Sequence, residues 1–203
     1  MMREIICLSA LTYGGYCSER LIVGTVFGCL AFLLMFLGDL NDWRFRIPVL
    51  RFSFPVGFVM LAASSAALMG LEKPEPTVIG RYFFIVMAAA FFLLLIFSLF
   101  FSLPAREAYL TQEKKRPVCT TGLYSLCRHP GFLCFFFLYI ALHFAFGFPW
   151  IDVFLFSALN FALILFEDRI VFPSCLADYG AYKETTPFLL PGFRYLHTFF
   201  KKK

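Results

Sequence analysis

The sequence predicts an all-α integral membrane protein that crosses the bilayer about five times. Hydrophobic residues make up 61% of the 203 residues and charged residues only 15%, whereas soluble domains contain roughly a quarter charged residues. Long uncharged runs alternate with polar segments, and the basic residues gather in every second polar segment. A chain of this composition cannot cover its apolar surface with polar groups, which disfavours a soluble fold.

The apolar runs approach or exceed the length of about 20 residues that a helix needs to cross a bilayer. The run 131–166 is too long for one span, and Gly147-Phe148-Pro149-Trp150 interrupts it. Proline disfavours continuing a helix, and tryptophan suits the membrane interface. The predicted spans are therefore residues 21–38, 52–71, 82–103, 130–147 and 150–167, and the last two form a tight hairpin.

The basic residues predict the orientation. The segments 39–51, 104–128 and 167–203 hold 14 of the 18 Lys and Arg residues. The remaining four are Arg3, Arg20, Lys73 and Arg81. The positive-inside rule places the first set, with the C-terminus, in the cytosol. The membrane itself is either a bacterial inner membrane or that of the endoplasmic reticulum, and the sequence does not distinguish them.

One polar group precedes the fourth span. Pro130 fits the first turn of a helix, where its missing N–H costs nothing, so Arg128 and His129 lie at the positive end of that helix. Cationic or donor side chains beside free backbone N–H groups form an anion site. An isolated Arg-His-Pro is also typical of an arginine that only contacts the headgroup region.

A second polar group follows the fifth span. Adjacent acids at a cytosolic helix end, Glu167 and Asp168, oppose both the helix dipole and the positive-inside trend. They can bind an ammonium or ribose hydroxyls, or they are solvated acids paired with Arg169 or Lys183. Neighbouring helical residues point about 100° apart, which favours Glu167 as the one that faces a site. The tight hairpin makes the two polar groups neighbours.

Residues 116–191 resemble the isoprenylcysteine carboxyl methyltransferase and phospholipid methyltransferase superfamily of membrane enzymes. The resemblance is carried by Val118-Cys119-Thr120-Thr121-Gly122-Leu123-Tyr124, Arg128-His129-Pro130, Glu167-Asp168, Tyr179, Tyr182, Pro187 and Pro191. Phe132 stands where the family usually has tyrosine, and Asp168 replaces its second glutamate.

The resemblance implies methyl transfer from S-adenosylmethionine to a carboxylate, amine or thiol of a lipophilic or prenylated substrate. It assigns cofactor binding to Gly122, Tyr124, Arg128, His129, Pro130, Phe132, Glu167, Asp168, Tyr179 and Tyr182. Among these, Arg128 and Glu167 are the expected catalytic residues. Residues 104–203 then form the catalytic region, and residues 1–103 form an N-terminal transmembrane region with a substrate or scaffold role.

Spacing alone predicts a substrate pocket. Phe132, Phe136, Tyr139 and His143 recur at four, three and four residues, so they share one face of the fourth span. Asn160 shares a face with Glu167 on the fifth span, and polar groups inside membranes usually face the bundle interior. These residues either line a pocket for a lipophilic acceptor or make ordinary aromatic packing with one interhelical hydrogen bond.

Two other functional classes stay open. Membrane reductases of the sterol or steroid 5α-reductase type, which use NADPH, share a Pro-Phe-Leu ending like Pro187-Phe188-Leu189. A non-catalytic membrane scaffold would bind neither cofactor. The seven cysteines form no C-x-x-C pair and only three histidines exist, so we expect no metal site. The lipid bilayer is the expected environment, and no nucleic-acid partner is predicted.

Overall fold

The computed structural model describes residues 2–73, 76–101 and 116–190. Its elements in chain order are α1 (Met2–Leu40), η1 (Asn41–Phe45), η2 (Val49–Phe52), α2 (Ser53–Leu68), α3 (Val78–Ile96), η3 (Phe97–Phe101), β1 (Arg116–Pro117), η4 (Gly122–Ser125), α5 (Pro130–Phe146), α6 (Trp150–Phe166), η5 (Glu167–Val171), α7 (Phe172–Cys175), β2 (Leu176–Ala177) and α8 (Tyr179–Thr185). The strands are one short parallel pair that aligns Arg116 with Leu176. The predicted all-α membrane fold is confirmed.

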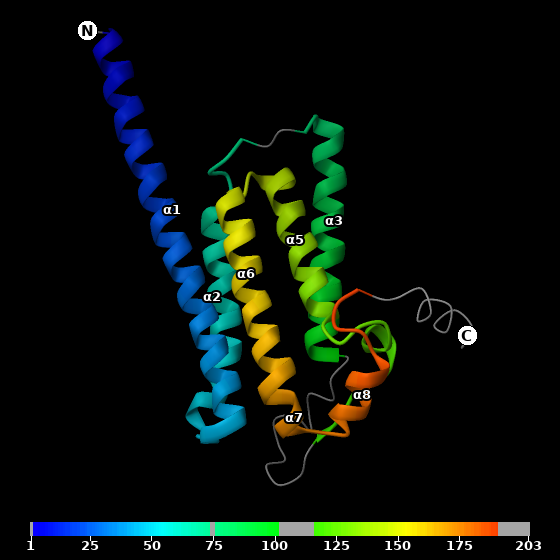
Figure 1. Ribbon diagram of the computed structural model, residues 1–203. Coiled ribbons are helices and arrows are strands. Elements are labelled where there is room, and N and C mark those ends of the chain that lie inside the picture. The colour runs from blue at the N-terminus through cyan, green and yellow to red at the C-terminus, as the bar shows by residue number, and fades with distance from the viewer. Residues whose placement is uncertain (1, 74–75, 102–115, 191–203) are drawn as a thin grey trace.

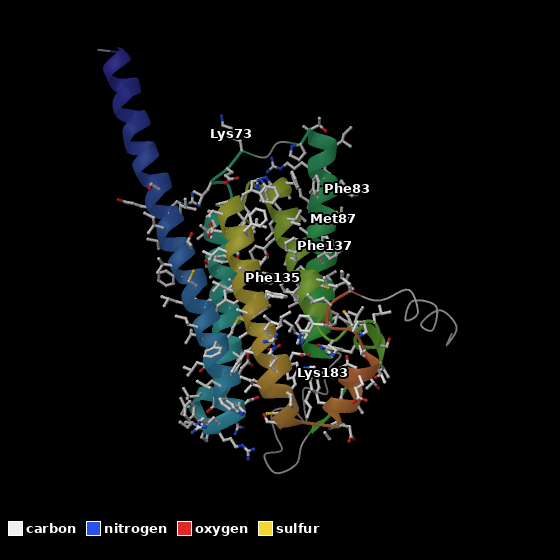
Figure 2. The ribbon with its side chains drawn as sticks, viewed as in Figure 1. Lys73, Phe83, Met87, Phe135, Phe137 and Lys183 are labelled. Carbon is white, nitrogen blue, oxygen red and sulfur yellow. The ribbon has the colours of Figure 1, made fainter. Side chains whose placement is uncertain are left out.

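The long helices form one bundle (Figure 1). Helix α1 packs along α2, α3 packs along α5, and α6 contacts both α1 and α5. We call the end where α1 and α6 finish and α5 begins the motif end. The opposite end, where the chain turns from α5 into α6, is the turn end. Figure 2 shows Lys73 at the turn end and Lys183 at the motif end.

Within the described residues, four helical segments are long and apolar enough to cross a membrane: Ser18–Phe45, Val49–Leu68, Val78–Leu99 and Trp150–Cys175. The fourth predicted span corresponds to Pro130–Phe146, which is a shorter apolar helix of 17 residues. Large apolar side chains on the outer helix faces are exposed, for example Leu33, Val59 and Leu93. Such faces suit contact with lipid rather than water.

The predicted end of the last span needs a correction. We expected the helix to stop at Glu167, but the chain stays helical to Cys175 through the π-helical turn η5. A π turn inserts an extra residue into the helical repeat and is frequent at functional sites. Glu167 and Asp168 therefore lie inside a continuous helical segment, with helix before and after them, and not at a helix end.

The predicted hairpin turn is present. Gly147 ends α5 with a positive φ of 65°, a conformation that glycine adopts without steric cost. A Cβ at this position would collide with the backbone carbonyl of Glu72. The backbone N–H of Glu72 donates to the carbonyl of Gly147 at 3.0 Å. The turn thus fixes how α5 and α6 emerge toward the motif end.

Aromatic side chains of the α5–α6 hairpin pack together in the interior of the bundle. Phe148 and Phe156 are fully buried, and the ring of Tyr139 packs edge-on against both, at 5.1 and 5.9 Å between centroids. The hydroxyl of Tyr139 lies 2.6 Å from Ser65 on α2. Asp152 is also fully buried and accepts a hydrogen bond of 2.7 Å from Thr25 on α1. These contacts join the N-terminal helices to the hairpin.

Candidate active site

Asp168 is the centre of the polar cluster at the motif end. It is only 4% exposed. The Nε atom of Arg128 lies 2.8 Å from its Oδ1, and Lys183 Nζ donates to its Oδ2 at 2.8 Å. The hydroxyl of Tyr179 donates to Oδ1 at 2.6 Å. Asp168 is therefore a carboxylate whose charge is neutralised within the protein.

Arg128 ties the C-terminal segment to the bundle. Its Nη1 donates to the carbonyls of Lys183 at 2.9 Å and Thr186 at 3.1 Å. Its backbone N–H donates to the carbonyl of Pro187 at 2.9 Å, and its guanidinium lies over the ring of Phe188 at 5.6 Å. With 8% exposure, this guanidinium already has protein partners for most of its donors.

The ring of His129 lies between the two acids of the motif. Its Nδ1 is 3.8 Å from Glu167 Oε2, and its Nε2 is 3.5 Å from Asp168 Oδ1. The ring stacks on Phe172 at 5.7 Å. Burial lowers the pKa of His129 below its ordinary value of 6.5, and Asp168 only partly opposes this effect. His129 is thus a neutral hydrogen-bonding ring at neutral pH rather than a second cation.

Glu167 has a different environment from Asp168. It has no arginine or lysine partner among the ion pairs of the described residues, and its nearest basic group is the neutral His129. Its carboxyl group lies within hydrogen-bonding reach of Asp39, near the end of α1. We predicted cationic neighbours for Glu167, but Arg128 pairs with Asp168 instead. The neighbouring acids of the motif thus have unequal partners.

The tyrosines of the motif hold the segment before α5. The hydroxyl of Tyr124 donates to the carbonyl of Ser98 at 3.2 Å, and that of Tyr182 donates to the carbonyl of Tyr124 at 2.6 Å. Burial raises the pKa of Tyr124 to about 12 and raises the pKa of Tyr182 as well. Both therefore remain protonated donors. Gly122 starts this turn with a φ of 60°.

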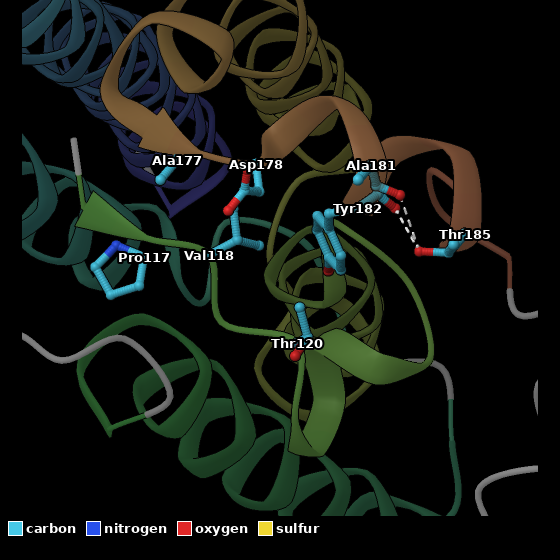
Figure 3. Close-up of a pocket in the computed structure, with 8 residues that line it drawn as sticks. All are labelled: Pro117, Val118, Thr120, Ala177, Asp178, Ala181, Tyr182 and Thr185. Atoms are coloured by element: carbon cyan, nitrogen blue, oxygen red, sulfur yellow. Dashed lines mark hydrogen bonds between the residues drawn. The ribbon is translucent and has the colours of Figure 1, made fainter.

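A groove of about 420 Å³ lies beside this cluster (Figure 3). It separates the segment before η4 from α8, and Tyr182 stands at its inner wall. Its lining residues are Pro117, Val118, Thr120, Ala177, Asp178, Ala181, Tyr182 and Thr185. The hydroxyls of Thr120 and Thr185 and the carboxylate of Asp178 give this otherwise apolar groove a few polar groups.

The predicted substrate stripe runs along α5 but does not stay at the motif end. Phe132 and Phe136 are half-buried near it, with ring centroids 6.4 Å apart. Tyr139 packs in the bundle interior, and His143 lies at the turn end, where its Nδ1 is 2.7 Å from the carbonyl of Phe148. Eleven residues of helix correspond to about 16 Å, so one small pocket cannot hold the whole stripe.

Pro130 and Asn160 are the remaining residues that the sequence assigned to the cofactor site or the substrate pocket. Pro130 is buried in the first turn of α5, where its missing N–H removes no helical hydrogen bond. Asn160 is half-buried on α6. In the described part of the chain, no group of three or more His, Cys, Asp or Glu side chains could hold a metal ion. The roles of these residues stay predictions.

Sequence reasoning missed Asp39, but it named Lys183 as one alternative partner of the acidic pair, and Lys183 contacts Asp168. Asp39 directly follows the uncharged run 21–38, and an acid at the end of such a run was a usable signal. Lys183 directly follows Tyr182 of the motif, but its contact with Asp168 depends on how α8 folds back. For Asp39, nothing in the local sequence identifies the acidic pair as its neighbour.

The comparison with protein families matches residues 83–172 to the isoprenylcysteine carboxyl methyltransferase family. The match includes α3, α5, α6 and η5, and therefore Arg128, His129, Glu167 and Asp168. It confirms the resemblance found in the sequence. No curated protein and no solved structure shows a significant match.

Proposed function

Because residues 83–172 match the isoprenylcysteine carboxyl methyltransferase family, we propose that the chain is a membrane methyltransferase that uses S-adenosylmethionine. The observation that supports this most is the meeting of the Arg-His-Pro segment, the acidic pair and α8 at one end of the bundle. The proposed acceptor is a lipophilic molecule, because the surrounding helices present exposed apolar faces.

The residues at the motif end fit the charge pattern of this cofactor, which has a carboxylate, an ammonium, ribose hydroxyls and a sulfonium. Glu167 offers a carboxyl group for the ammonium or ribose hydroxyls. Lys183, whose side chain is 43% exposed, and the ring of His129 offer donors for the carboxylate. Arg128 and Asp168 form the frame that holds these groups in place.

When bound, the cofactor supplies an electrophilic methyl group. The protein's task is then mainly alignment, since methyl transfer requires an in-line approach and little acid–base chemistry. Phe132 and Phe136, with Phe161 5.6 Å from Phe132, provide an apolar wall beside the cluster. Such a wall can orient a lipophilic acceptor and exclude water.

We propose that the motif end faces the cytosol. The described basic residues at that end are Arg44, Arg46, Arg51, Arg116, Arg128, Arg169 and Lys183. The turn end has Arg20, Lys73 and Arg81, and Figure 2 shows Lys73 at its tip. Reporters fused after Lys203 and inserted at Lys73 should report opposite sides, with Lys203 in the cytosol. The same side for both would refute this orientation.

The test of the function is transfer of a labelled methyl group from S-adenosylmethionine into a membrane extract of lipids and prenylcysteines. Full-length protein in detergent should label an extractable lipophilic product, and the Glu167→Gln variant should label little. The control variant is Glu184→Gln, which changes an exposed acid on α8. No labelled product from folded wild-type protein would contradict the proposal.

A further inference from the structure

The segment that follows α8 covers the start of α5. We call residues 186–190 the strap, and Figure 1 shows it in orange-red, returning from α8 toward the start of α5. The backbone N–H of Arg128 donates to the carbonyl of Pro187 at 2.9 Å, and that of His129 donates to the carbonyl of Phe188 at 3.2 Å. The strap therefore occupies backbone N–H groups that the sequence predicted to be free for an anion.

Phe188 is the side chain that holds the strap against the bundle. Its ring packs edge-on against His129 at 5.0 Å between centroids, and the guanidinium of Arg128 lies over it at 5.6 Å. On its other side it meets the ring of Phe161 at 6.2 Å. Phe161 is 38% exposed on α6. Phe188 thus joins the apolar wall of α6 to the polar cluster at the motif end.

The polar cluster beneath the strap is closed. Arg128, His129 and Asp168 are only 8%, 5% and 4% exposed, and the side chain of Glu167 is 15% exposed. The groove in Figure 3 is lined by Tyr182 and by none of these four side chains. A hydrogen bond to a ligand needs a contact of about 3 Å. A molecule as large as S-adenosylmethionine therefore reaches the cluster only after a covering segment has moved.

The strap is the covering segment that can move without opening the bundle. Helices α5 and α6 pack into the hydrophobic core through buried side chains such as Cys134 and Leu163. The strap packs from one side, and its Leu190 is 76% exposed. Its start is fixed to α8 by the N–H of Thr186, which donates to the carbonyl of Tyr182 at 2.9 Å. Segments with little buried apolar surface open at a low free energy, and Thr186 is the natural hinge.

We propose that the strap is an autoinhibitory lid, which excludes S-adenosylmethionine while it covers the start of α5 and admits it when it moves away about Thr186. The inference rests on the proposed function and adds the regulation of its site. The apparent dissociation constant of the cofactor is then its intrinsic value divided by the fraction of open protein. A change that loosens the strap should therefore tighten cofactor binding, whereas losing a direct contact with the cofactor would weaken it.

Hydrogen exchange of one backbone amide measures strap opening without any ligand. The full chain has only three histidines, so protein in detergent with isotope-labelled histidine gives three amide signals, which are assigned by substituting each histidine in turn. The amide of His129 is covered by the strap, whereas that of His143 lies inside α5. In wild type the His129 amide should exchange faster than the His143 amide, because strap opening leaves α5 folded.

The decisive variant is Phe188→Ala. It should speed exchange of the His129 amide by about tenfold, the effect of losing a ring–ring and a cation–π contact. Calorimetry should show that S-adenosylmethionine binds tighter by the same factor. The matched control is Leu190→Ala, which removes an exposed side chain of the same strap and should change neither value. An unchanged exchange rate at His143 shows that α5 is intact in both variants.

A second variant keeps the test decisive if Phe188→Ala does not fold. Phe188→Leu retains apolar bulk but loses the ring, so it should move exchange at His129 and cofactor affinity in the same direction by a smaller factor.

Two results would overturn the proposal. One is unchanged exchange at His129 in a folded Phe188→Ala protein, which would mean that the strap does not protect this amide. The other is faster exchange at His129 with cofactor affinity no higher than in the Leu190→Ala control, which would mean that the strap and the cofactor do not compete. Failure of the proposed function looks different, because neither wild type nor any variant would then bind S-adenosylmethionine, and the strap would have no cofactor to exclude.

Discussion

Replacing Arg128 by alanine separates a structural role of this residue from a direct role in cofactor binding. The guanidinium is 8% exposed and lies against Asp168, which is 4% exposed. It also bonds the carbonyls of Lys183 and Thr186. Removing one partner of a buried ion pair costs about 3–5 kcal/mol, because the other charge stays buried without compensation.

For a chain of this length, 3–5 kcal/mol corresponds to a fall in Tm of roughly 6–20 °C. Arg128→Lys should recover part of the loss, since a lysine reaches Asp168 or a carbonyl but lacks the planar fork that holds both. Thermal unfolding of both variants in one detergent measures this. The matched control is Arg169→Ala, an exposed arginine on η5, with an expected change within about 0.5 kcal/mol.

The reasoning would be refuted by an Arg128→Ala protein that is as stable as the Arg169→Ala control but has lost affinity for S-adenosylmethionine. That result would make Arg128 a direct ligand of the cofactor, as the family resemblance alone implies. A stability loss with cofactor affinity recovered at low temperature supports its role as the group that positions α8.

Three further predictions follow from the same cluster and the turn. Glu167→Gln should abolish most methyl transfer with little change in Tm, whereas Asp168→Asn should lower the free energy of unfolding by about 3–5 kcal/mol because it leaves a buried guanidinium unpaired. Activity and thermal unfolding of both variants test this. An Asp168→Asn protein as stable as wild type would contradict it. Because burial lowers the pKa of His129 below 6.5, the folded protein takes up this proton less readily than the unfolded chain. The stability of the protein should therefore fall as the pH drops through 6.5 toward the lowered pKa. Tm measured between pH 5 and 7.5 should fall less steeply in His129→Gln than in wild type. Identical slopes of Tm against pH in the two proteins would refute the assignment. Gly147→Ala should lower the free energy of unfolding by more than about 1 kcal/mol, since φ at residue 147 is positive and a Cβ there would meet a backbone carbonyl. The control is Gly180→Ala, where a Cβ would meet open space. Equal Tm values for the two variants would disprove the argument.

Much of the fold was predictable because membrane spans depend on local composition. The predicted spans fall within the observed helices or overlap them, and the Gly147 turn was readable from its neighbours in sequence. The helical continuation from Glu167 to Cys175 was not readable, because a π turn leaves no periodic signal. The extension of α1 back to Met2 was missed for a related reason, since its first residues lack a clear apolar run.

The candidate site was only partly predictable. The sequence indicated that opposite charges meet at the motif end, because the hairpin forces Arg128 and the acidic pair together. It did not indicate that Arg128 would pair with Asp168 while Glu167 lies near Asp39, since this pairing depends on the position of η5 against α1. Pairing over long sequence separations is a property of packing, which local pattern does not encode.

The central claim is that the motif end binds S-adenosylmethionine, and calorimetric titration of the full chain in detergent tests it most directly. S-adenosylmethionine and NADPH are titrated separately into wild-type protein and the Glu167→Gln variant. Our account predicts one-to-one binding of S-adenosylmethionine to wild type, at least about tenfold weaker binding to the variant, and no binding of NADPH. Binding of NADPH without binding of S-adenosylmethionine would contradict the account and identify a reductase instead.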